Sequence, residues 1–293
     1  MRITVLAGPT GIGKTDLSIE LAQRWGVPIV SADARQCYAE LAIGAAPPTA
    51  EQRAAVLHHF VADRSVTDLL DANRYAQEAR PLVEASLQAH GRALVVGGSG
   101  LYIKALLQGF DDLPAPDDAL RGQLAERLAQ EGLATLAAEL CGLDPAAAGR
   151  VDLANPRRVL RALEVTLATG RPFTQHLGQG ADPLPYPVDF YCLDMPRPQL
   201  YERIDRRVLA MMDAGLEAEA RSLYPLRHLP SLQTVGYREL FDYFAGQGTL
   251  AEAVARIQQN TRRYAKRQLT WFRAQPGIKF LATAEAQATL LAD

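Results

Sequence analysis

The sequence predicts an α/β fold: a parallel β-sheet with helices on both faces, into which a helical domain is inserted. Short β-branched runs alternate with helical stretches in the first hundred residues, as is typical of a parallel sheet. The middle of the chain shows helical periodicity and no convincing strand. At 293 residues, the chain is long enough for about two domains.

The first half of the sheet is predicted from three apolar runs, each followed by a helical pattern. The predicted strands cover residues 3–7, 27–31 and 93–96. The predicted helices cover residues 14–24, 73–89 and 101–107. This alternation predicts parallel strands joined by helical crossovers.

Prolines mark both ends of the inserted segment. Pro114 and Pro116 open it, and Pro183, Pro185 and Pro187 close it, which stiffens both connections to the sheet. We therefore expect one domain to consist of residues 1–111 and 188–293, and the helical insertion to cover residues 112–187.

Strand character returns after the insertion. Residues 188–193 are a predicted strand, and residues 279–282 are a candidate last strand. Helices are predicted over residues 198–213, 216–223, 237–244 and 250–272.

Composition excludes several classes of protein. A hydrophobic content of 48% and a net charge of −2 are ordinary for a globular chain and exclude disorder. No apolar run approaches the ~18 residues of a membrane span, so we expect a cytoplasmic protein without a membrane partner. The three cysteines are too widely spaced for a disulfide framework or a zinc site. His58 and His59 are adjacent and lack partners at ligand spacing, so we expect them to be structural.

A glycine-rich loop follows the first predicted strand. Residues 8–15 match the pattern G-x-x-x-x-G-K-[ST] between a strand and a helix, which predicts a P-loop NTPase-like core. The loop N–H groups and the helix dipole attract a polyphosphate, Lys14 adds positive charge, and the Thr15 hydroxyl is a candidate Mg²⁺ ligand. The predicted phosphate-binding residues are Gly8, Pro9, Thr10, Gly11, Ile12, Gly13, Lys14 and Thr15.

One part that usually accompanies a nucleotide-hydrolysing P-loop is missing from the sequence. The predicted strand over residues 93–96 runs into Gly-Gly-Ser-Gly rather than into a metal-binding aspartate. The loop therefore indicates phosphate, without indicating a nucleoside triphosphate.

Asp33 directly follows the second predicted strand. Ligands of open parallel sheets gather at the carboxyl ends of the strands, so Asp33 is expected to face the phosphate loop as a general base. Capping of a following helix is an alternative role for this carboxylate.

The C-terminal part of the chain contains a basic helix. Residues 253–273 hold six basic residues and no acidic one, with Tyr264, Trp271 and Phe272 among them. Such a helix can bind a nucleic-acid backbone, and an arginine-rich solvated face is the alternative.

Several motifs together resemble one known family. GPTGIGKT, SADARQCY, HHFVAD, GGSGLYIKALLQG, NPRRVLRALEV, VGYREL and TRRYAKRQLTWFR occur in the order typical of tRNA dimethylallyltransferases and extend over residues 8–273. The resemblance implies transfer of a dimethylallyl group from its diphosphate to the N6 amine of an adenosine beside the anticodon. The P-loop would then bind a diphosphate leaving group together with Mg²⁺, and the partner would be the anticodon stem-loop of tRNA.

The resemblance also implies roles for individual residues. Asp33 matches the general base, Thr10 and Lys14 contact the diphosphate, and Arg207 stabilises it, with Arg203 as the alternative arginine. The implied tRNA contacts are Asp33, Ala34, Arg35, Gln36, Ser99, Arg121, Arg157, Arg158, Val159, Leu160 and Arg161. The basic helix adds Arg262, Arg263, Lys266 and Arg267 to this set.

The sequence departs from the family pattern at a few positions. Ala34 and Cys37 replace the commoner serine and valine, and Ser99 stands where threonine is usual. Ala45 and Pro47 replace threonine and lysine, which puts local contacts there in doubt.

Two other functions are compatible with a P-loop. A small-molecule kinase would bind ATP there and use Asp33 to deprotonate an acceptor, but would not need the basic helix. A non-catalytic RNA-binding protein would not need Lys14, Thr15 and Asp33 together. We expect the prenyltransferase, acting as a monomer.

Overall fold

The computed structural model describes residues 1–293 apart from 110, 112, 115–116, 179–181 and 292–293. Two compact units make up the chain: Met1–Leu107 with Leu184–Asp293, and Gln108–Pro183. Each boundary lies four residues before the one expected from the sequence. The expected first residue of the insertion, Asp112, and the hinge residue Pro116 lie outside the described residues.

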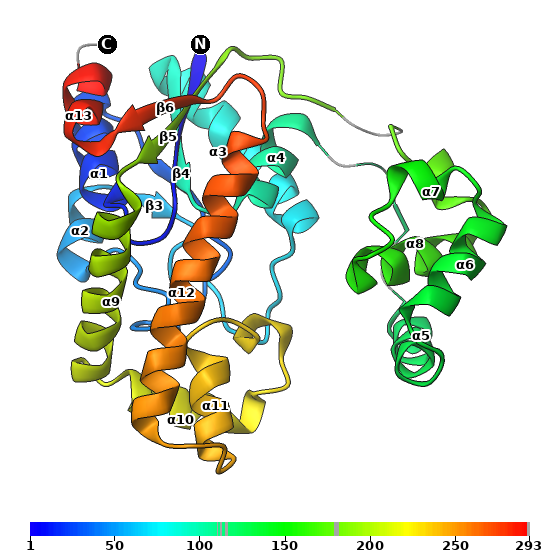
Figure 1. Ribbon diagram of the computed structural model, residues 1–293. Coiled ribbons are helices and arrows are strands. Elements are labelled where there is room, and N and C mark those ends of the chain that lie inside the picture. The colour runs from blue at the N-terminus through cyan, green and yellow to red at the C-terminus, as the bar shows by residue number, and fades with distance from the viewer. Residues whose placement is uncertain (110, 112, 115–116, 179–181, 292–293) are drawn as a thin grey trace. The chain divides into compact units, whose positions relative to one another are not determined.

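A six-stranded parallel sheet forms the centre of the first unit (Figure 1). The strand order is β3-β2-β4-β1-β5-β6, so β1 lies inside the sheet between β4 and β5. The predicted parallel sheet is therefore confirmed. The strands are β1 (Arg2–Ala7), β2 (Ile29–Ala32), β3 (His58–His59), β4 (Arg92–Gly97), β5 (Val188–Asp194) and β6 (Lys279–Ala282).

Helices cover both faces of this sheet, as the sequence predicted (Figure 1). Leu21 of α1 and Leu290 of α13 share an apolar cluster with Leu6 of β1, while α3 contacts β1, β2 and β4. Alternation along each strand lets both faces of the sheet pack apolar side chains. The helices before the insertion are α1 (Lys14–Trp25), α2 (Ala50–Ala55), α3 (Ala72–His90) and α4 (Gly100–Gln108).

The remaining helices of the first unit follow β5. They are α9 (Arg197–Asp213), α10 (Leu216–Leu223), α11 (Tyr237–Phe244), α12 (Leu250–Arg273) and α13 (Thr283–Leu291), with short 3₁₀ turns at Tyr224–Leu226 and Pro230–Leu232. Helices α9 and α12 lie side by side (Figure 1). Thr249 begins α12 through a capping box with Glu252, which satisfies backbone donors of the first turn.

The second unit is helical and has its own apolar core. Its elements are α5 (Asp118–Glu131), α6 (Leu133–Leu143), α7 (Ala147–Arg150), α8 (Pro156–Thr169) and a 3₁₀ turn at Phe173–Gln175. Leu136, Leu140 and Leu163 are fully buried in this core. Asn155 caps α8 by accepting hydrogen bonds from the backbone N–H groups of Arg157 and Arg158.

Three elements were not predicted, and one strand boundary was wrong. The second strand starts at Ile29 rather than Val27, because the Val27 N–H bonds to Ala22 at the end of α1. Strand β3 is two residues long, too short for a period-two pattern. Helices α2 and α13 were also missed, although the capping box of Thr49 and Gln52 was a usable signal for α2.

Candidate active site

The phosphate loop connects β1 to α1. Gly11 and Gly13 have φ angles of 82° and 98°, which lie in the left-handed region that glycine adopts without strain. Lys14 begins α1, and its Nζ donates to the carbonyl oxygens of Gly8 and Pro9 at 2.9 and 3.0 Å. The lysine therefore bonds only to loop carbonyls among the described residues, and no carboxylate pairs with it.

Burial and neighbouring charges perturb the basic groups of the loop. Burial lowers the pKa of Lys14 to about 8; the carboxylate of Asp33 opposes this shift, and the guanidinium of Arg207 adds to it. Burial also lowers the pKa of Arg207, again opposed by Asp33. These three charged groups are thus close enough to interact, as the sequence required.

Two arginines of α9 reach the loop. Nη1 of Arg207 donates to Oγ1 of Thr10 over 3.4 Å, and Nε of Arg203 donates to the carbonyl of Gly11 at 3.0 Å. Both candidates for the diphosphate-stabilising arginine therefore lie at the loop, and Arg207 is the less exposed of the two.

Asp33 lies in a turn at the carboxyl end of β2. Its Oδ1 accepts hydrogen bonds from the N–H groups of Arg35 and Gln36, at 2.9 and 3.3 Å. No α-helix follows, so the carboxylate caps a turn rather than the helix that was the alternative. Within the described part of the chain, no group donates a hydrogen bond to Oδ2. One oxygen thus orients the carboxylate, and the other is available as a base.

A cleft of 530 Å³ joins the loop to this carboxylate. Residues predicted to bind phosphate or RNA line it, namely Thr10, Gly11, Gly13, Lys14, Thr15, Asp33, Gln36 and Arg207. The lining also includes residues to which the sequence gave no role in the site, namely Ala45, Ala46, Pro48, His58 and Val61. His58 donates from Nδ1 to the carbonyl of Val56 at 2.8 Å, and burial lowers the pKa of its ring.

Gln268 of α12 connects the phosphate loop to the end of β4. It accepts a hydrogen bond from the Thr10 N–H at 2.9 Å and donates to the Gly98 carbonyl at 2.8 Å. A Cβ on Gly97 would lie 2.1 Å from the carbonyl oxygen of Ala32, and one on Gly100 would lie 2.2 Å from the ring of Trp271. The glycine-rich end of β4 is therefore required for close packing against β2 and α12.

Ser99, in the same segment, holds the turn after β2. Its Oγ accepts from the Ala34 N–H at 3.0 Å, and its own N–H donates to the Ala32 carbonyl at 3.1 Å. Nη1 of Arg35 donates to the Ala34 carbonyl at 3.1 Å. Hydrogen bonds therefore join these predicted RNA contacts to the turn after β2, namely Ala34, Arg35, Gln36 and Ser99.

A second loop supports the Asp33 turn from outside. Ala62 and Asp63 donate backbone hydrogen bonds to the carbonyls of Gln36 and Cys37, at 2.8 and 3.0 Å. Phe60 and Ala62 have φ angles of 61° and 50°, which are strained for residues other than glycine. Asp63 contacts this strained segment directly, because its Oδ2 accepts a hydrogen bond from the Phe60 N–H at 3.2 Å.

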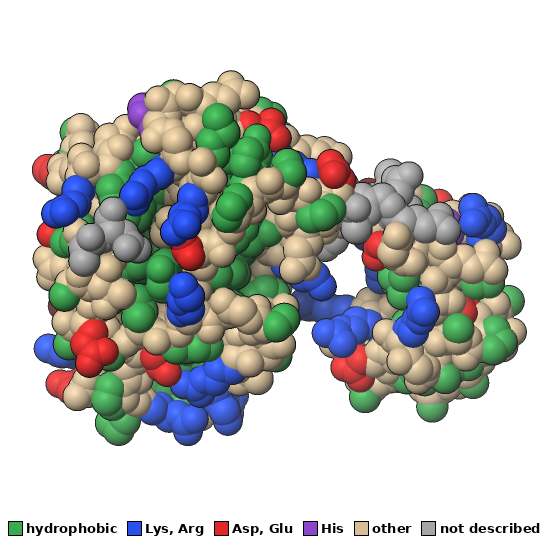
Figure 2. Space-filling view, turned by 90° about the horizontal axis from the view of Figure 1, so that it is seen from above, with side chains coloured by type: hydrophobic (Ala, Val, Ile, Leu, Met, Phe, Trp, Pro, Cys, Tyr) green, Lys and Arg blue, Asp and Glu red, His purple; other side chains and the backbone are tan. Residues whose placement is uncertain are grey.

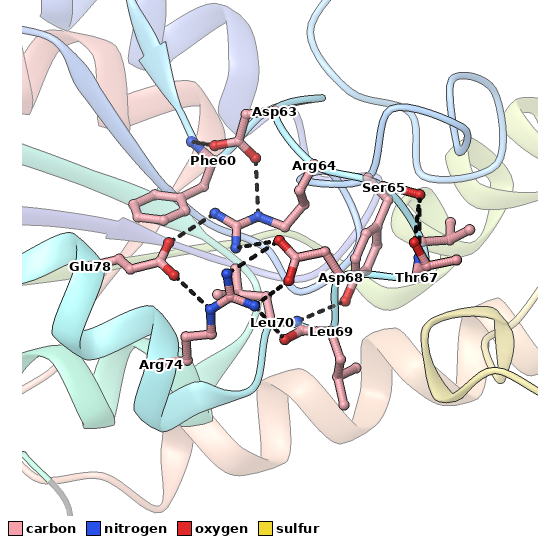
Figure 3. Close-up of polar contacts among 12 residues, drawn as sticks. Phe60, Asp63, Arg64, Ser65, Thr67, Asp68, Leu69, Leu70, Arg74 and Glu78 are labelled. Atoms are coloured by element: carbon pink, nitrogen blue, oxygen red, sulfur yellow. Dashed lines mark hydrogen bonds and ion pairs between the residues drawn. The ribbon is translucent and has the colours of Figure 1, made fainter.

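Arg64 is the centre of a charged network (Figure 3). Its guanidinium pairs with Asp63 at 3.2 Å and with Glu78 at 3.0 Å, and Glu78 also pairs with Arg74 at 2.7 Å. Asp68 pairs with Arg74 as well. Because this network ties the loop to helix α3, it fixes the loop that in turn supports the Asp33 turn.

The basic residues of α12 divide into two groups. Arg263, Lys266 and Arg267 are exposed, whereas Arg262 forms an ion pair with Asp205 of α9. Figure 2 shows Lys and Arg side chains on the visible face of each unit, interspersed with hydrophobic and polar ones. Arg262 is therefore engaged in an ion pair within the protein, whereas the exposed side chains of Arg263, Lys266 and Arg267 are accessible to a polyanion.

The candidate tRNA-binding arginines of the insertion also fall into two groups, exposed ones and ones that pair with a buried carboxylate. Arg157 and Arg158 are exposed at the start of α8, and Arg158 lies 3.6 Å from Asp152. Arg121 and Arg161 both pair at 3.0 Å with Glu164, a carboxylate whose side chain is 3% exposed.

Two aliphatic candidates on α8 belong to the core of the insertion. Val159 is fully buried, and Leu160 packs against the same apolar cluster. The expectation that Val159 contacts tRNA is therefore wrong, because the residue is fully buried in the core against which α8 packs. Leu160 is partly exposed, and its contact with tRNA stays a prediction.

The described residues contain no group of three or more His, Cys, Asp or Glu side chains arranged to hold a metal ion. The cleft is lined by the carboxylates of Asp16 and Asp33 and by four hydroxyl side chains, those of Thr10, Thr15, Ser18 and Ser31. None of the described helices combines the length and apolar character needed to cross a membrane.

The fold and its loop define the class of P-loop α/β proteins. Within that class, the sequence matches the family described as IPP transferase over residues 36–275. The protein belongs to this family, and it is a transferase.

Similar proteins extend over nearly the whole chain. A tRNA dimethylallyltransferase 2 from Porphyromonas gingivalis is 47% identical over 98% of this chain and 96% of its own. A tRNA dimethylallyltransferase 1 from Phocaeicola vulgatus is 45% identical over 94% and 92%. The crystal structure of the full-length tRNA isopentenylpyrophosphate transferase from Bacillus halodurans is similar with a TM-score of 0.72 at 34% identity, covering 99% of this chain and 94% of that one. These similarities confirm the family and do not support the small-molecule kinase.

Proposed function

We propose that this protein moves a dimethylallyl group from dimethylallyl diphosphate to the exocyclic N6 of an adenosine adjacent to the anticodon of tRNA, and releases diphosphate. The observation that carries the proposal is a single cleft shared by the phosphate loop, Arg207 and Asp33. The names of the relatives support the substrates.

The basic end of the cleft suits a diphosphate leaving group. As the bond between C1 of the dimethylallyl group and the diphosphate oxygen breaks, negative charge grows on that oxygen. The N–H groups of residues 11–15, the Lys14 ammonium and the Arg207 guanidinium would stabilise this charge, and the position of Lys14 and Arg207 in the cleft supports this. Thr10, held by Gln268 and contacting Arg207, offers its hydroxyl to the same group.

The acidic end of the cleft suits the nucleophile. An adenine amine is weakly nucleophilic because its lone pair is delocalised into the ring, so loss of a proton must accompany attack. N6 forms a bond to C1 while C1 leaves the diphosphate, and the N6 proton passes to Oδ2 of Asp33. The adenosine must leave its stack to reach this oxygen, as in other base-modifying enzymes.

Mg²⁺ is the proposed cofactor, and the donor chemistry of the cleft fits it. Mg²⁺ takes most of its ligands from substrate phosphates and water rather than from a protein cage, which agrees with a site offering the Thr15 hydroxyl and few carboxylates. When bound, the ion would neutralise part of the diphosphate charge.

For tRNA binding, we propose that both units contribute. Exposed cations of α12 (Arg263, Lys266 and Arg267) and of α8 (Arg157 and Arg158) would contact backbone phosphates of the anticodon stem-loop. Ala34, Arg35, Gln36 and Ser99 would lie near the extruded base, beside Asp33. The proposed working form is a cytoplasmic monomer.

The test is a transfer assay with purified protein, Mg²⁺, unmodified anticodon stem-loop RNA and radiolabelled dimethylallyl diphosphate. We expect label in the RNA without added ATP, and we expect Asp33→Asn to slow its incorporation by about 10²–10⁴. A parallel tube contains labelled ATP and small hydroxyl acceptors in place of the prenyl donor. Phosphate transfer there, with no prenyl label in RNA, would overturn the proposal in favour of a kinase.

A further inference from the structure

One wall of the cleft is a loop without regular secondary structure. Residues 41–48 form it, and Ala45, Ala46 and Pro48 line the cleft. Ala46 has a φ of 44°, a left-handed conformation that costs a non-glycine residue free energy. Such a conformation persists only where surrounding contacts hold it.

Glu219 of α10 holds this loop from the side away from the cleft. Its carboxylate accepts hydrogen bonds from the N–H groups of Ile43 and Gly44, at 2.7 and 2.9 Å. The hydroxyl of Tyr237 donates to Oε1 at 2.5 Å. The approach is close, since a Cβ on Gly44 would lie 2.4 Å from the Tyr237 hydroxyl.

Gln36 holds the same loop from the cleft side. Its Nε2 donates to the carbonyls of Ala45 and Ala46, at 3.4 and 3.0 Å. The backbone N–H of Gln36 also donates to Oδ1 of Asp33. A continuous set of hydrogen bonds therefore runs from Glu219 through the loop to the proposed base.

We propose that Glu219 is a positioning residue for the transfer reaction: by fixing Ile43 and Gly44 it sets the cleft wall, and through Gln36 it sets the orientation of Asp33. The inference rests on the proposed function, because it assigns Glu219 to the reaction carried out in that cleft. Glu219 itself is not among the residues that line the cleft.

The substitution Glu219→Gln isolates this role. The side chain keeps its size, but its NH₂ group cannot accept from a backbone N–H, so one of the two loop contacts is lost. We expect kcat to fall about tenfold or more, since misplacement of a catalytic group by a fraction of an ångström has effects of this size. The dissociation constant for inorganic pyrophosphate should not change, because the phosphate loop is not touched.

The matched control is Glu217→Gln on the same helix. Glu217 pairs with Arg221 at 2.7 Å and forms no hydrogen bond or ion pair with the described residues 41–48, so kcat should stay at the wild-type value. Tyr237→Phe removes a partner of Glu219 but leaves both backbone contacts, so its kcat should lie between those of the two glutamine variants.

Three readouts separate positioning from simple destabilisation. Pyrophosphate titration by calorimetry counts correctly folded sites, transfer kinetics separate kcat from KM, and hydrogen exchange follows the amides of residues 41–48. The inference is supported if Glu219→Gln lowers kcat, binds pyrophosphate with full stoichiometry and shows faster hydrogen exchange only in residues 41–48. Wild-type kcat in Glu219→Gln, or a loss of kcat matched by an equal loss of binding sites, would overturn the inference.

A second variant covers the case in which Glu219→Gln does not fold. Gly44→Ala disturbs the same contact from the loop side, because its Cβ must displace Tyr237, and we expect the same pattern of results. If the wild type and Glu217→Gln transfer no prenyl group, the proposed function fails. Hydrogen exchange would then still decide whether Glu219 fixes the loop.

Discussion

The buried charge of Lys14 in the phosphate loop should lower the stability of the folded protein as long as no ligand is bound. Burial lowers the pKa of Lys14 to about 8, so the charged ammonium is less stable in the folded protein than in water. One pKa unit corresponds to about 1.4 kcal/mol, so a shift of this size costs about 3 kcal/mol of stability at pH 7. Lys14→Met removes the charge and keeps an apolar stem. Because it also loses two hydrogen bonds from a charged donor to loop carbonyls, worth about 1.5 kcal/mol each, we expect the two effects nearly to cancel at pH 7.

The sign of the pH dependence follows from the direction of the shift. The pKa of Lys14 is lower in the folded state, so between its folded value of about 8 and its unfolded value the unfolded chain binds more protons. Wild-type stability therefore rises with pH through that window, while Lys14→Met lacks this contribution. Between pH 7 and 9.5, the wild type should gain about 2 kcal/mol relative to the variant.

Urea unfolding followed by tryptophan fluorescence measures this difference. Trp25 and Trp271 both belong to the first unit, so the signal reports the unit that contains the loop. Lys104→Met, at an exposed position of α4, is the control and should show the pH dependence of the wild type. If the gap between wild type and Lys14→Met is the same at pH 7 and 9.5, the argument from burial is wrong.

Three further predictions concern the base, the basic helix and the sheet. Asp33→Asn should lower kcat by about 10²–10⁴ and leave the tRNA dissociation constant nearly unchanged, so a matching loss of binding in a filter assay would contradict its role as a base. Arg263→Ala combined with Arg267→Ala should weaken tRNA binding and reduce the slope of log K against log salt by about 1.5, whereas an unchanged slope would place the RNA elsewhere. Gly97→Ala should prevent a stable fold, because its Cβ would lie 2.1 Å from the Ala32 carbonyl oxygen; circular dichroism and solubility indistinguishable from wild type would refute this.

Local patterns made the phosphate loop and Asp33 predictable. A glycine-rich loop between a strand and a helix, and a carboxylate at a strand end, lie within a few residues of the elements that place them. Gln268 and Glu219 act on residues more than 170 positions away, and no local pattern marks them. The β3 residue His58 was assigned a structural role, because its place in the cleft depends on which strand β3 pairs with.

The case of Val159 was different, because the necessary signal was present. Val159, Ala162 and Leu163 follow the i, i+3, i+4 spacing of a buried helix face, and all three are in the core. The resemblance to the family assigned the same tRNA-binding role to every residue from 157 to 161. It did not distinguish the residues that face solvent from those that pack in the core.

Helix α12 has an inward-facing set and a solvent-facing set of residues. It should therefore tolerate substitutions and insertions to different degrees. Ala265, Gln268 and Phe272 face inward, while Lys266 and Arg267 face solvent. Each added residue turns everything beyond it by about 100°, so one insertion before Ala265 would move Gln268 off the inward-facing position and put Arg267 there. The fold should tolerate substitution of a single exposed cation of α12. A shift of register, in contrast, would separate Gln268 from both the phosphate loop and the end of β4. The fold thus depends more on the register of this helix than on its charge.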